Sequence, residues 1–312
     1  MRVVPLPNLF VVGAPKSGTT ALHRYLDQHP QVAMSAVKEP KFFLADGRAP
    51  AHRGPGDERA SAAYVYDRRE YEALFRYPPG GAGERTWAGE STPFYLWHPQ
   101  AAPRIKALVP EARLIAVLRE PVARAYSNWA HLRFEGRETL DFAAALDAED
   151  RRAREDWEPF WFYRSLGLYG EQLDRLFDVF DRGQVFVTLA EHVEASPSTV
   201  LDQIWTFLGV EPLGAELVPQ RLNEATYRPV DRRSRALTRL AQRSTPLRRA
   251  VPAPVRGWAR ETVRRQVRSR ATTGAHAARL RREFGHLFAV DRRLLEAGGM
   301  DLAAWDEVDS RT

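Results

Sequence analysis

Short apolar runs alternate along the chain with stretches in which apolar residues recur at helical spacing. Ala21, Leu22, Tyr25 and Leu26 share one face of a predicted helix that begins near Ser17 and ends before His29-Pro30. Further helices are expected over residues 123–133, 142–154, 168–180 and 198–208. Buried strands are expected over residues 9–12, 32–34, 87–90, 114–118 and 185–189. This alternation predicts an α/β fold, a three-layer arrangement whose central parallel sheet is flanked by helices, in a single domain spanning 1–312.

Two segments interrupt the alternation. Residues 45–83 are rich in Gly, Pro, Asp and Arg, which predicts an irregular insertion. An arginine-rich helical segment over about 228–282 includes thirteen arginines and one acidic residue, Glu261, between Arg232 and Arg270. It could bind nucleic acid or a membrane surface, or clamp an acidic acceptor. Trp258 is its only aromatic residue, so it offers few rings on which nucleic-acid bases could stack. A solvated helical face is the default interpretation.

Charge and composition narrow the classes of function. The 312 residues include 46 basic and 40 acidic ones, a net charge of +6 that suits an anionic ligand. Without cysteine the chain has no disulfide, thiol nucleophile or thiolate metal site. The early apolar stretch 9–14 is too short for a signal-peptide core, and no transmembrane segment is predicted, so we expect a cytoplasmic protein. Only four lysines occur, and three of them, Lys16, Lys38 and Lys41, lie close together near the N-terminus.

A phosphate-binding loop follows the first predicted strand. Residues 13–20 read Gly-Ala-Pro-Lys-Ser-Gly-Thr-Thr and lead directly into a helix. Backbone N–H groups at a helix start, together with the helix dipole, favour a bound anion there. Lys16 adds a positive charge, and Ser17, Thr19 and Thr20 add hydroxyl donors.

The loop differs from that of nucleoside-triphosphate enzymes. Those loops carry lysine directly after the second glycine, where this chain has Thr19, and Lys16 stands before Gly18. The later strand 114–118 is followed by Arg119 rather than by an acidic residue that could hold Mg²⁺. An ATP-dependent P-loop kinase is therefore the alternative, not the preferred interpretation.

These residues resemble the sulfotransferase family that uses 3'-phosphoadenosine 5'-phosphosulfate (PAPS). Residues 15–20 match the family loop P-K-[ST]-G-[TS]-[TS], and Arg119-Glu120-Pro121 with Ser127 is similar to its second signature, with Glu120 in place of Asp or Asn. Residues 39–43 resemble the E-x-x-F-F segment of heparan-sulfate and related bacterial sulfotransferases. Residues 90–95 are similar to their K-T-P-x-Y segment, with Ser91 where some members carry lysine. The resemblance covers about residues 8–210.

The resemblance implies how the nucleotide is held. Lys16, Ser17, Gly18, Thr19 and Thr20 would bind the 5'-phosphosulfate. Arg119 and Ser127 would bind the 3'-phosphate, since a guanidinium fork matches phosphate oxygens. In relatives a loop closes over the 3'-phosphate, and Arg228 or Arg232 could act in this way here. The leaving product would be the 3',5'-bisphosphate PAP.

The resemblance also implies catalytic roles for Lys16 and Glu39. Sulfuryl transfer is expected to be an in-line displacement in which Lys16 offsets charge on the leaving oxygen, so that no metal is required. Glu39 would accept the acceptor's proton, and Lys38 and Lys41 beside it favour its ionised form. The alternative for Glu39 is a surface glutamate paired with one of these lysines. His98 is a reserve candidate for the base, because other branches of the family use histidine.

The acceptor is expected to be a small molecule or a glycan, with no nucleic acid beyond the nucleotide. Lys41, Trp161, Tyr163 and His98 are the candidate acceptor-binding residues. The aromatic cluster 157–163 could stack on an acceptor, but core packing explains it equally well. Neither the acceptor nor the oligomeric state is specified by the sequence.

Overall fold

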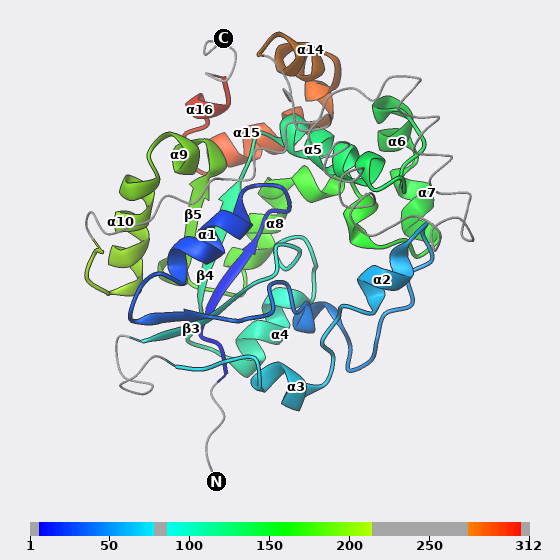
Figure 1. The fold of residues 1–312 in the computed structure, drawn as a ribbon. Helices are drawn as coiled ribbons and strands as arrows, with labels where there is room; N and C mark the ends of the chain where they lie inside the picture. Colours follow the sequence, from blue (N-terminus) through cyan, green and yellow to red (C-terminus); the bar gives the residue numbers. More distant parts are fainter. Residues whose placement is uncertain (1–5, 78–85, 214–273, 307–312) are drawn as a thin grey trace, which may run out of the picture.

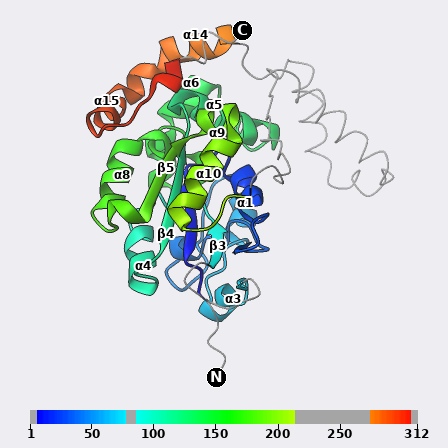
Figure 2. The same cartoon turned by 90° about the vertical axis from the view of Figure 1, so that its left-hand side faces the viewer.

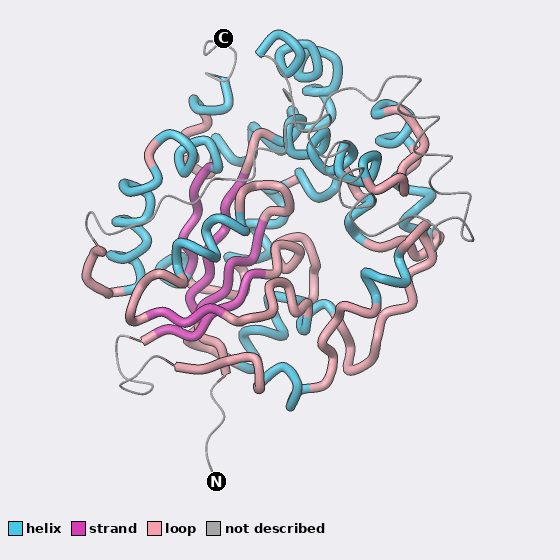
Figure 3. The backbone as a smooth tube through the Cα atoms, viewed as in Figure 1, coloured by secondary structure: helices cyan, strands magenta, loops and turns pink. Residues whose placement is uncertain are grey.

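The structure, a computed structural model, describes residues 6–77, 86–213 and 274–306. Its centre is a five-stranded parallel sheet with the strand order β2-β3-β1-β4-β5 (Figures 1 and 3). The strands are β1 (Leu9–Gly13), β2 (Val32–Met34), β3 (Trp87–Ser91), β4 (Arg113–Leu118) and β5 (Val185–Leu189). The five predicted strands and their parallel arrangement are confirmed, with bounds that differ by at most one residue at either end.

Alternate residues of the central strands pack against different helical layers. Phe10 and Val12 of β1 join one hydrophobic cluster, and Leu9 and Val11 join another. This period of two explains why the strands read as continuous apolar runs, since both faces of the sheet are covered. The three-layer α/β prediction is therefore confirmed.

Figure 2 shows the two helical layers on opposite sides of the sheet. One layer contains α4 (Ala101–Leu108), α8 (Tyr169–Phe177), α15 (Ala289–Ala297) and α16 (Ala303–Asp306). The other contains α1 (Thr19–Leu26), α9 (Ala190–Ala195) and α10 (Pro197–Leu208). The predicted helices at 168–180 and 198–208 correspond to α8 and α10.

A third hydrophobic cluster forms around α5 (Pro121–Phe134), beyond the carboxyl end of β4. It includes side chains of α6 (Phe142–Asp147), of the 3-10 turns η2 (Pro159–Trp161) and η3 (Ser165–Gly167), and of α14 (Gly274–Phe284). The single helix predicted over 142–154 is divided into α6 and α7 (Glu149–Arg154). Two further 3-10 turns are η4 (Arg182–Gln184) and η6 (Gly285–Phe288).

The insertion and the arginine-rich segment are described only in part. Within 45–77 the chain forms two one-turn helices, α2 (Asp57–Ser61) and α3 (Arg68–Glu72), and the 3-10 turn η1 (Phe42–Leu44) precedes them. Residues 78–83 of the predicted insertion lie outside the described residues. The same holds for Arg228, Arg232 and most of the arginine-rich segment, of which 274–282 belong to α14. No described helix is long and apolar enough to cross a membrane.

The sheet order brings the two predicted nucleotide motifs together. Strand β1 pairs with β4 on one side and with β3 on the other, all three in parallel. The loop after β1, the turn after β4 and the segment after β3 therefore leave the sheet at the same edge. Ligands of open parallel sheets bind at this edge.

Candidate active site

The loop after β1 is shaped by close packing and by left-handed backbone. A Cβ added to Gly13 would lie 2.7 Å from the Cβ of Leu96, so no larger residue fits where the strand ends. Lys16 has φ 69°, and Gly18, with φ 83°, is the N-cap of α1. The loop thus turns sharply before α1 begins. As at the start of any α-helix, the first N–H groups of α1 have no intrahelical acceptors.

Lys16 carries a perturbed ammonium group. Burial and, after it, the Arg119 guanidinium lower the pKa of Lys16 to about 8, while the carboxylates of Glu39 and Glu135 oppose this shift. Two carboxylates and two guanidinium groups, those of Arg119 and Arg124, therefore lie within electrostatic range of this lysine. A bound anion would add to the carboxylates and favour the charged ammonium.

Arg119 joins the turn after β4 to the loop. Its Nη1 donates a hydrogen bond to the backbone carbonyl of Lys16 at 3.1 Å, and the Tyr169 hydroxyl donates to the carbonyl of Arg119 at 2.9 Å. Glu120 caps α5, because its carboxylate accepts the N–H groups of Val122 at 3.0 Å and Ala123 at 2.7 Å. Glutamate at this position thus performs the capping role for which Asp or Asn is usual.

A cavity of about 410 Å³ lies at this edge of the sheet, within the size range of small-molecule sites. Predicted site residues from four separate segments line it: Lys16, Gly18, Thr19, Thr20, Glu39, Lys41, Arg119 and Ser127. Ser127 lies on α5, two helical turns after the strand-end arginine. The structure therefore brings the predicted nucleotide residues, apart from Ser17, and the predicted base to one cavity.

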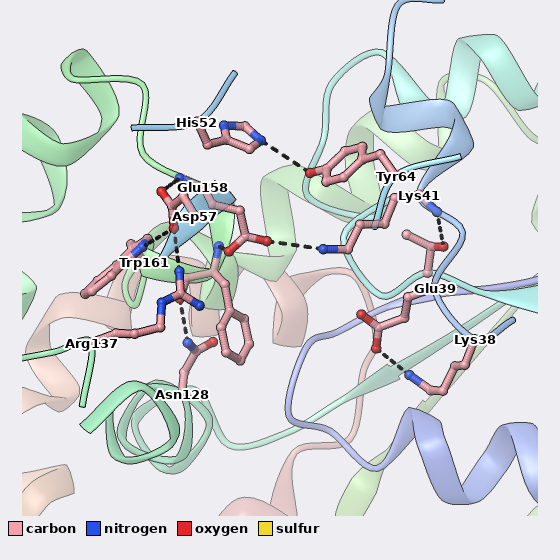
Figure 4. Close-up of polar contacts among 12 residues, drawn as sticks. Lys38, Glu39, Lys41, His52, Asp57, Tyr64, Asn128, Arg137, Glu158 and Trp161 are labelled. Atoms are coloured by element: carbon pink, nitrogen blue, oxygen red, sulfur yellow. Dashed lines mark hydrogen bonds and ion pairs between the residues drawn. The ribbon is translucent and has the colours of Figure 1, made fainter. Parts of the chain in front are cut away.

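Glu39 and Lys41 extend from one short segment between β2 and η1 (Figure 4). Both have left-handed backbone, with φ 62° at Glu39 and φ 61° at Lys41. The Glu39 carboxylate pairs with Lys38, and the buried Lys41 Nζ lies 3.3 Å from Glu158 Oε1. The surface pairing considered for Glu39 is thus present, yet Glu39 also lines the cavity.

A buried polar network next to the Lys41–Glu158 ion pair was not predicted. Asp57 is fully buried and accepts hydrogen bonds from Arg137, from the Trp161 indole at 2.8 Å and from the Glu158 N–H at 2.8 Å (Figure 4). Arg137 and Glu158 line the cavity themselves. Asp57 lies in the segment predicted to be irregular, where no sequence pattern marks it.

Further cavity residues come from α5 and its neighbourhood. His131 and Glu135 follow Ser127 by four and eight residues, and they form an ion pair at 3.3 Å when His131 is protonated. Helical spacing from Ser127 could have identified both. Asn128 Nδ2 donates to the carbonyl of Phe160 at 2.6 Å, and Phe160 and Phe94 are lining residues of the cavity.

Three candidate acceptor residues do not line the cavity. Trp161 and Tyr163 are buried core side chains, and the Tyr163 hydroxyl donates to Glu138 at 2.8 Å. His98 lies at the start of the segment leading to α4; burial and then Arg104 lower its pKa to about 4. From the aromatic cluster 157–163, Glu158 and Phe160 are the residues that reach the cavity.

The residues present fit a nucleotide bearing a phosphosulfate. Ser17 Oγ is buried and has no hydrogen-bond partner among the described residues, although Ser17 itself does not line the cavity. Lys16 and Arg119 place two cations beside the start of α1, where a helix dipole favours anions. Ser127 adds a hydroxyl on α5.

Comparisons with known proteins agree on one family. The model of a sulfotransferase family matches residues 7–213. A crystal structure of a sulfotransferase from Alicyclobacillus acidocaldarius is 33% identical, covers 97% of this chain and 99% of its own, and superposes with a TM-score of 0.71.

Curated relatives are similar over part of their length. The mouse heparan sulfate glucosamine 3-O-sulfotransferase 3B1 is 28% identical over 66% of this chain and 47% of its own length. The membrane-associated sulfotransferase kil1 of Dictyostelium discoideum is 34% identical over 41% of this chain and 23% of its own. The chain thus spans less than half the length of these relatives.

Proposed function

Because the chain belongs to the sulfotransferase family, we propose that it transfers a sulfuryl group from PAPS to a hydroxyl or amine of an acceptor. The observation that carries this proposal is the convergence of Lys16, Arg119 and Ser127 on one cavity. The three side chains come from two strand ends and a helix, and they suit a nucleotide with anionic groups at both its 5' and 3' positions.

Lys16 and the residues after it would hold the 5'-phosphosulfate. Bound PAPS supplies the sulfuryl group and leaves as PAP. The Lys16 ammonium, the first N–H groups of α1 and the hydroxyls of Thr19 and Thr20 would offset the charge that develops on the leaving phosphate oxygen. Arg119 and Ser127 would hold the 3'-phosphate. These groups provide the charge stabilisation without a metal ion.

Glu39 is the proposed general base. Its carboxylate would take the proton from the attacking hydroxyl or amine, and it lines the same cavity as Lys16. Its influence on the pKa of Lys16 indicates that the two groups are within electrostatic range. That position suits a base that acts beside the transferred group.

Acceptor binding is proposed for the remaining part of the cavity. Lys41 and Glu158 offer a cation and a carboxylate, and Phe94 and Phe160 offer apolar ring surfaces. Such a combination suits a hydroxylated small molecule or a sugar, and a relative is named for sulfation of heparan sulfate. Trp161 and Tyr163 would support this part of the cavity from the core.

Thermal-shift measurements with PAP, 5'-AMP and ATP, each with and without Mg²⁺, test the proposal. A ligand at a hundred times its Kd stabilises by about 2.7 kcal/mol, which is readily measured. We expect PAP to stabilise the protein more than 5'-AMP does, without Mg²⁺, and Lys16→Ala to reduce the effect. Stronger stabilisation by ATP with Mg²⁺ than by PAP would instead support the kinase alternative.

A further inference from the structure

Glu90 is a buried carboxylate at the end of β3 that lies behind the cavity rather than in its lining. It is 0% exposed. Its Oε1 accepts hydrogen bonds from the hydroxyls of Tyr71 and Tyr95, both at 2.7 Å, and its Oε2 accepts from Thr92 Oγ1 at 2.6 Å. Burial raises the pKa of Glu90 to about 7, and the three hydroxyl hydrogen bonds oppose this rise by stabilising the carboxylate. None of these three donors is charged, so among the described residues the hydrogen bonds to this carboxylate come from neutral hydroxyls.

Two of the three hydroxyls continue to the segment that carries the proposed base. Thr92 Oγ1 accepts the backbone N–H of Lys41 at 3.2 Å, and the Tyr95 hydroxyl accepts the backbone N–H of Phe43 at 3.4 Å. A hydroxyl has a single hydrogen to donate. Both hydroxyls donate their hydrogen to Glu90 in a hydrogen bond, so their lone pairs are turned toward the segment 41–43. The carboxylate therefore sets the direction of two hydrogen bonds that it does not itself make.

The segment 39–43 needs such support. Glu39 and Lys41 are both non-glycine residues with left-handed backbone, a conformation that is strained for an L side chain at each position. Only the surrounding structure can hold two such residues with one proline between them. The same backbone conformation directs both side chains to the cavity.

We propose that Glu90 is a positioning residue which, through Thr92 and Tyr95, fixes the left-handed segment 39–43 so that Glu39 and Lys41 face the cavity. This proposal rests on the function proposed above. Glu90 touches no substrate in this scheme, and its effect reaches the reaction through the geometry of Glu39.

The network itself contains a matched control. Tyr71→Phe removes one hydroxyl from Glu90 but none from the segment 39–43, and it keeps the ring stacked on Phe42 with a centroid distance of 4.2 Å. Tyr95→Phe also keeps its ring but removes an acceptor of the Phe43 N–H. Thr92→Val removes the acceptor of the Lys41 N–H at nearly constant shape, and Thr92→Ser restores a hydroxyl that can donate and accept.

Amide hydrogen exchange of the PAP-loaded protein, resolved to residues 38–45, provides the first test. We expect Thr92→Val and Tyr95→Phe to accelerate exchange there about 5- to 10-fold, since one hydrogen bond contributes on the order of 1 kcal/mol. Tyr71→Phe and Thr92→Ser should change it less than about twofold. Equal acceleration by Tyr71→Phe, or no acceleration by Thr92→Val and Tyr95→Phe, would overturn the proposal, because Glu90 would then contribute only to general stability.

A kinetic cycle then separates this proposal from the function on which it rests. With PAPS and an extract fraction that supports wild-type turnover, Thr92→Val should lower kcat and leave the KM for PAPS unchanged, and Thr92→Ser should rescue kcat. In a Glu39→Gln background Thr92→Val should have little further effect on kcat. If Glu39→Gln alone leaves kcat unchanged, the proposed base is wrong, while the exchange result still reports on the segment. If the losses of kcat from Thr92→Val and Glu39→Gln multiply fully in the double variant, Thr92 does not act through Glu39.

Discussion

The guanidinium of Arg119 donates a hydrogen bond to the backbone carbonyl of Lys16, a residue 103 positions earlier in the chain. The two motifs proposed to hold the 3'-phosphate and the 5'-phosphosulfate are therefore in direct contact. Arg119 contributes to the lowered pKa of Lys16 as well as to the shape of the loop. Changes at Arg119 consequently alter both ends of the proposed nucleotide site, whereas Ser127 offers a cleaner test of one end.

We predict that Ser127→Ala weakens the binding of PAP but not of 5'-AMP. Loss of a hydrogen bond to a charged group costs about 1.5–3 kcal/mol, or about 10- to 150-fold in Kd. Titration calorimetry with the two nucleotides measures the difference, and 5'-AMP serves as the internal control because it lacks the 3'-phosphate. An equal loss for both nucleotides would mean that Ser127 does not bind the 3'-phosphate.

We predict that PAP binding takes up protons at alkaline pH. The pKa of Lys16 is about 8 in the free protein, so at pH 9 most of its amine is neutral. A bound anion raises that pKa and recruits a proton, whereas at pH 6.5 Lys16 is charged both before and after binding. Calorimetry in two buffers of different ionisation enthalpy measures the uptake. Lys16→Met should abolish the uptake at pH 9, and its persistence in that variant would assign it to another group.

We predict that Glu39→Gln lowers turnover about 10²- to 10⁴-fold, the usual contribution of a general base, while PAP affinity stays unchanged. The amide keeps the size of the side chain but cannot accept the proton. Turnover of radiolabelled PAPS and calorimetry with PAP measure the two effects. Glu135→Gln is the informative comparison, because the Glu135 carboxylate, like that of Glu39, raises the pKa of Lys16. A larger loss of turnover in Glu135→Gln would transfer the role of the base to that residue.

We predict that two adjacent arginines of α7 differ sharply in their effect on stability. Arg152 forms a buried ion pair with Glu138 at 2.8 Å, with side chains 2% and 1% exposed. Arg152→Met leaves a buried carboxylate without its cation and should cost about 3–5 kcal/mol. Arg151 pairs with Glu155 on the surface, so Arg151→Met should cost under about 0.5 kcal/mol. Urea unfolding followed by circular dichroism measures both, and similar losses would contradict the burial argument.

Much of the fold could be predicted because the central strands β1 and β4 bury both of their faces. A segment such as 114–118 must then be apolar at every position, and that run is visible without a structure. The division of 142–154 into two helices was not predicted, because apolar spacing does not show where a helix breaks. The one-turn helices α2 and α3 are too short for periodicity to reveal.

For the site, the sequence alone determined where the proposed nucleotide motifs lie, because residues 15–20 and Arg119 with Ser127 form local motifs whose chemistry depends on residues close together in the chain. Only the tertiary structure decided which acceptor candidates reach the cavity. It placed Glu158 and Phe160 in the cavity wall and Trp161 and Tyr163 in the core, although all four lie within one aromatic stretch. Likewise, Asp57 is held by partners distant in sequence, and the hydroxyls of Thr92 and Tyr95 that bond Glu90 accept N–H groups from the distant residues Lys41 and Phe43. The physical reason is that burial and long-range hydrogen bonds arise from how the elements pack, which no local pattern of residues records.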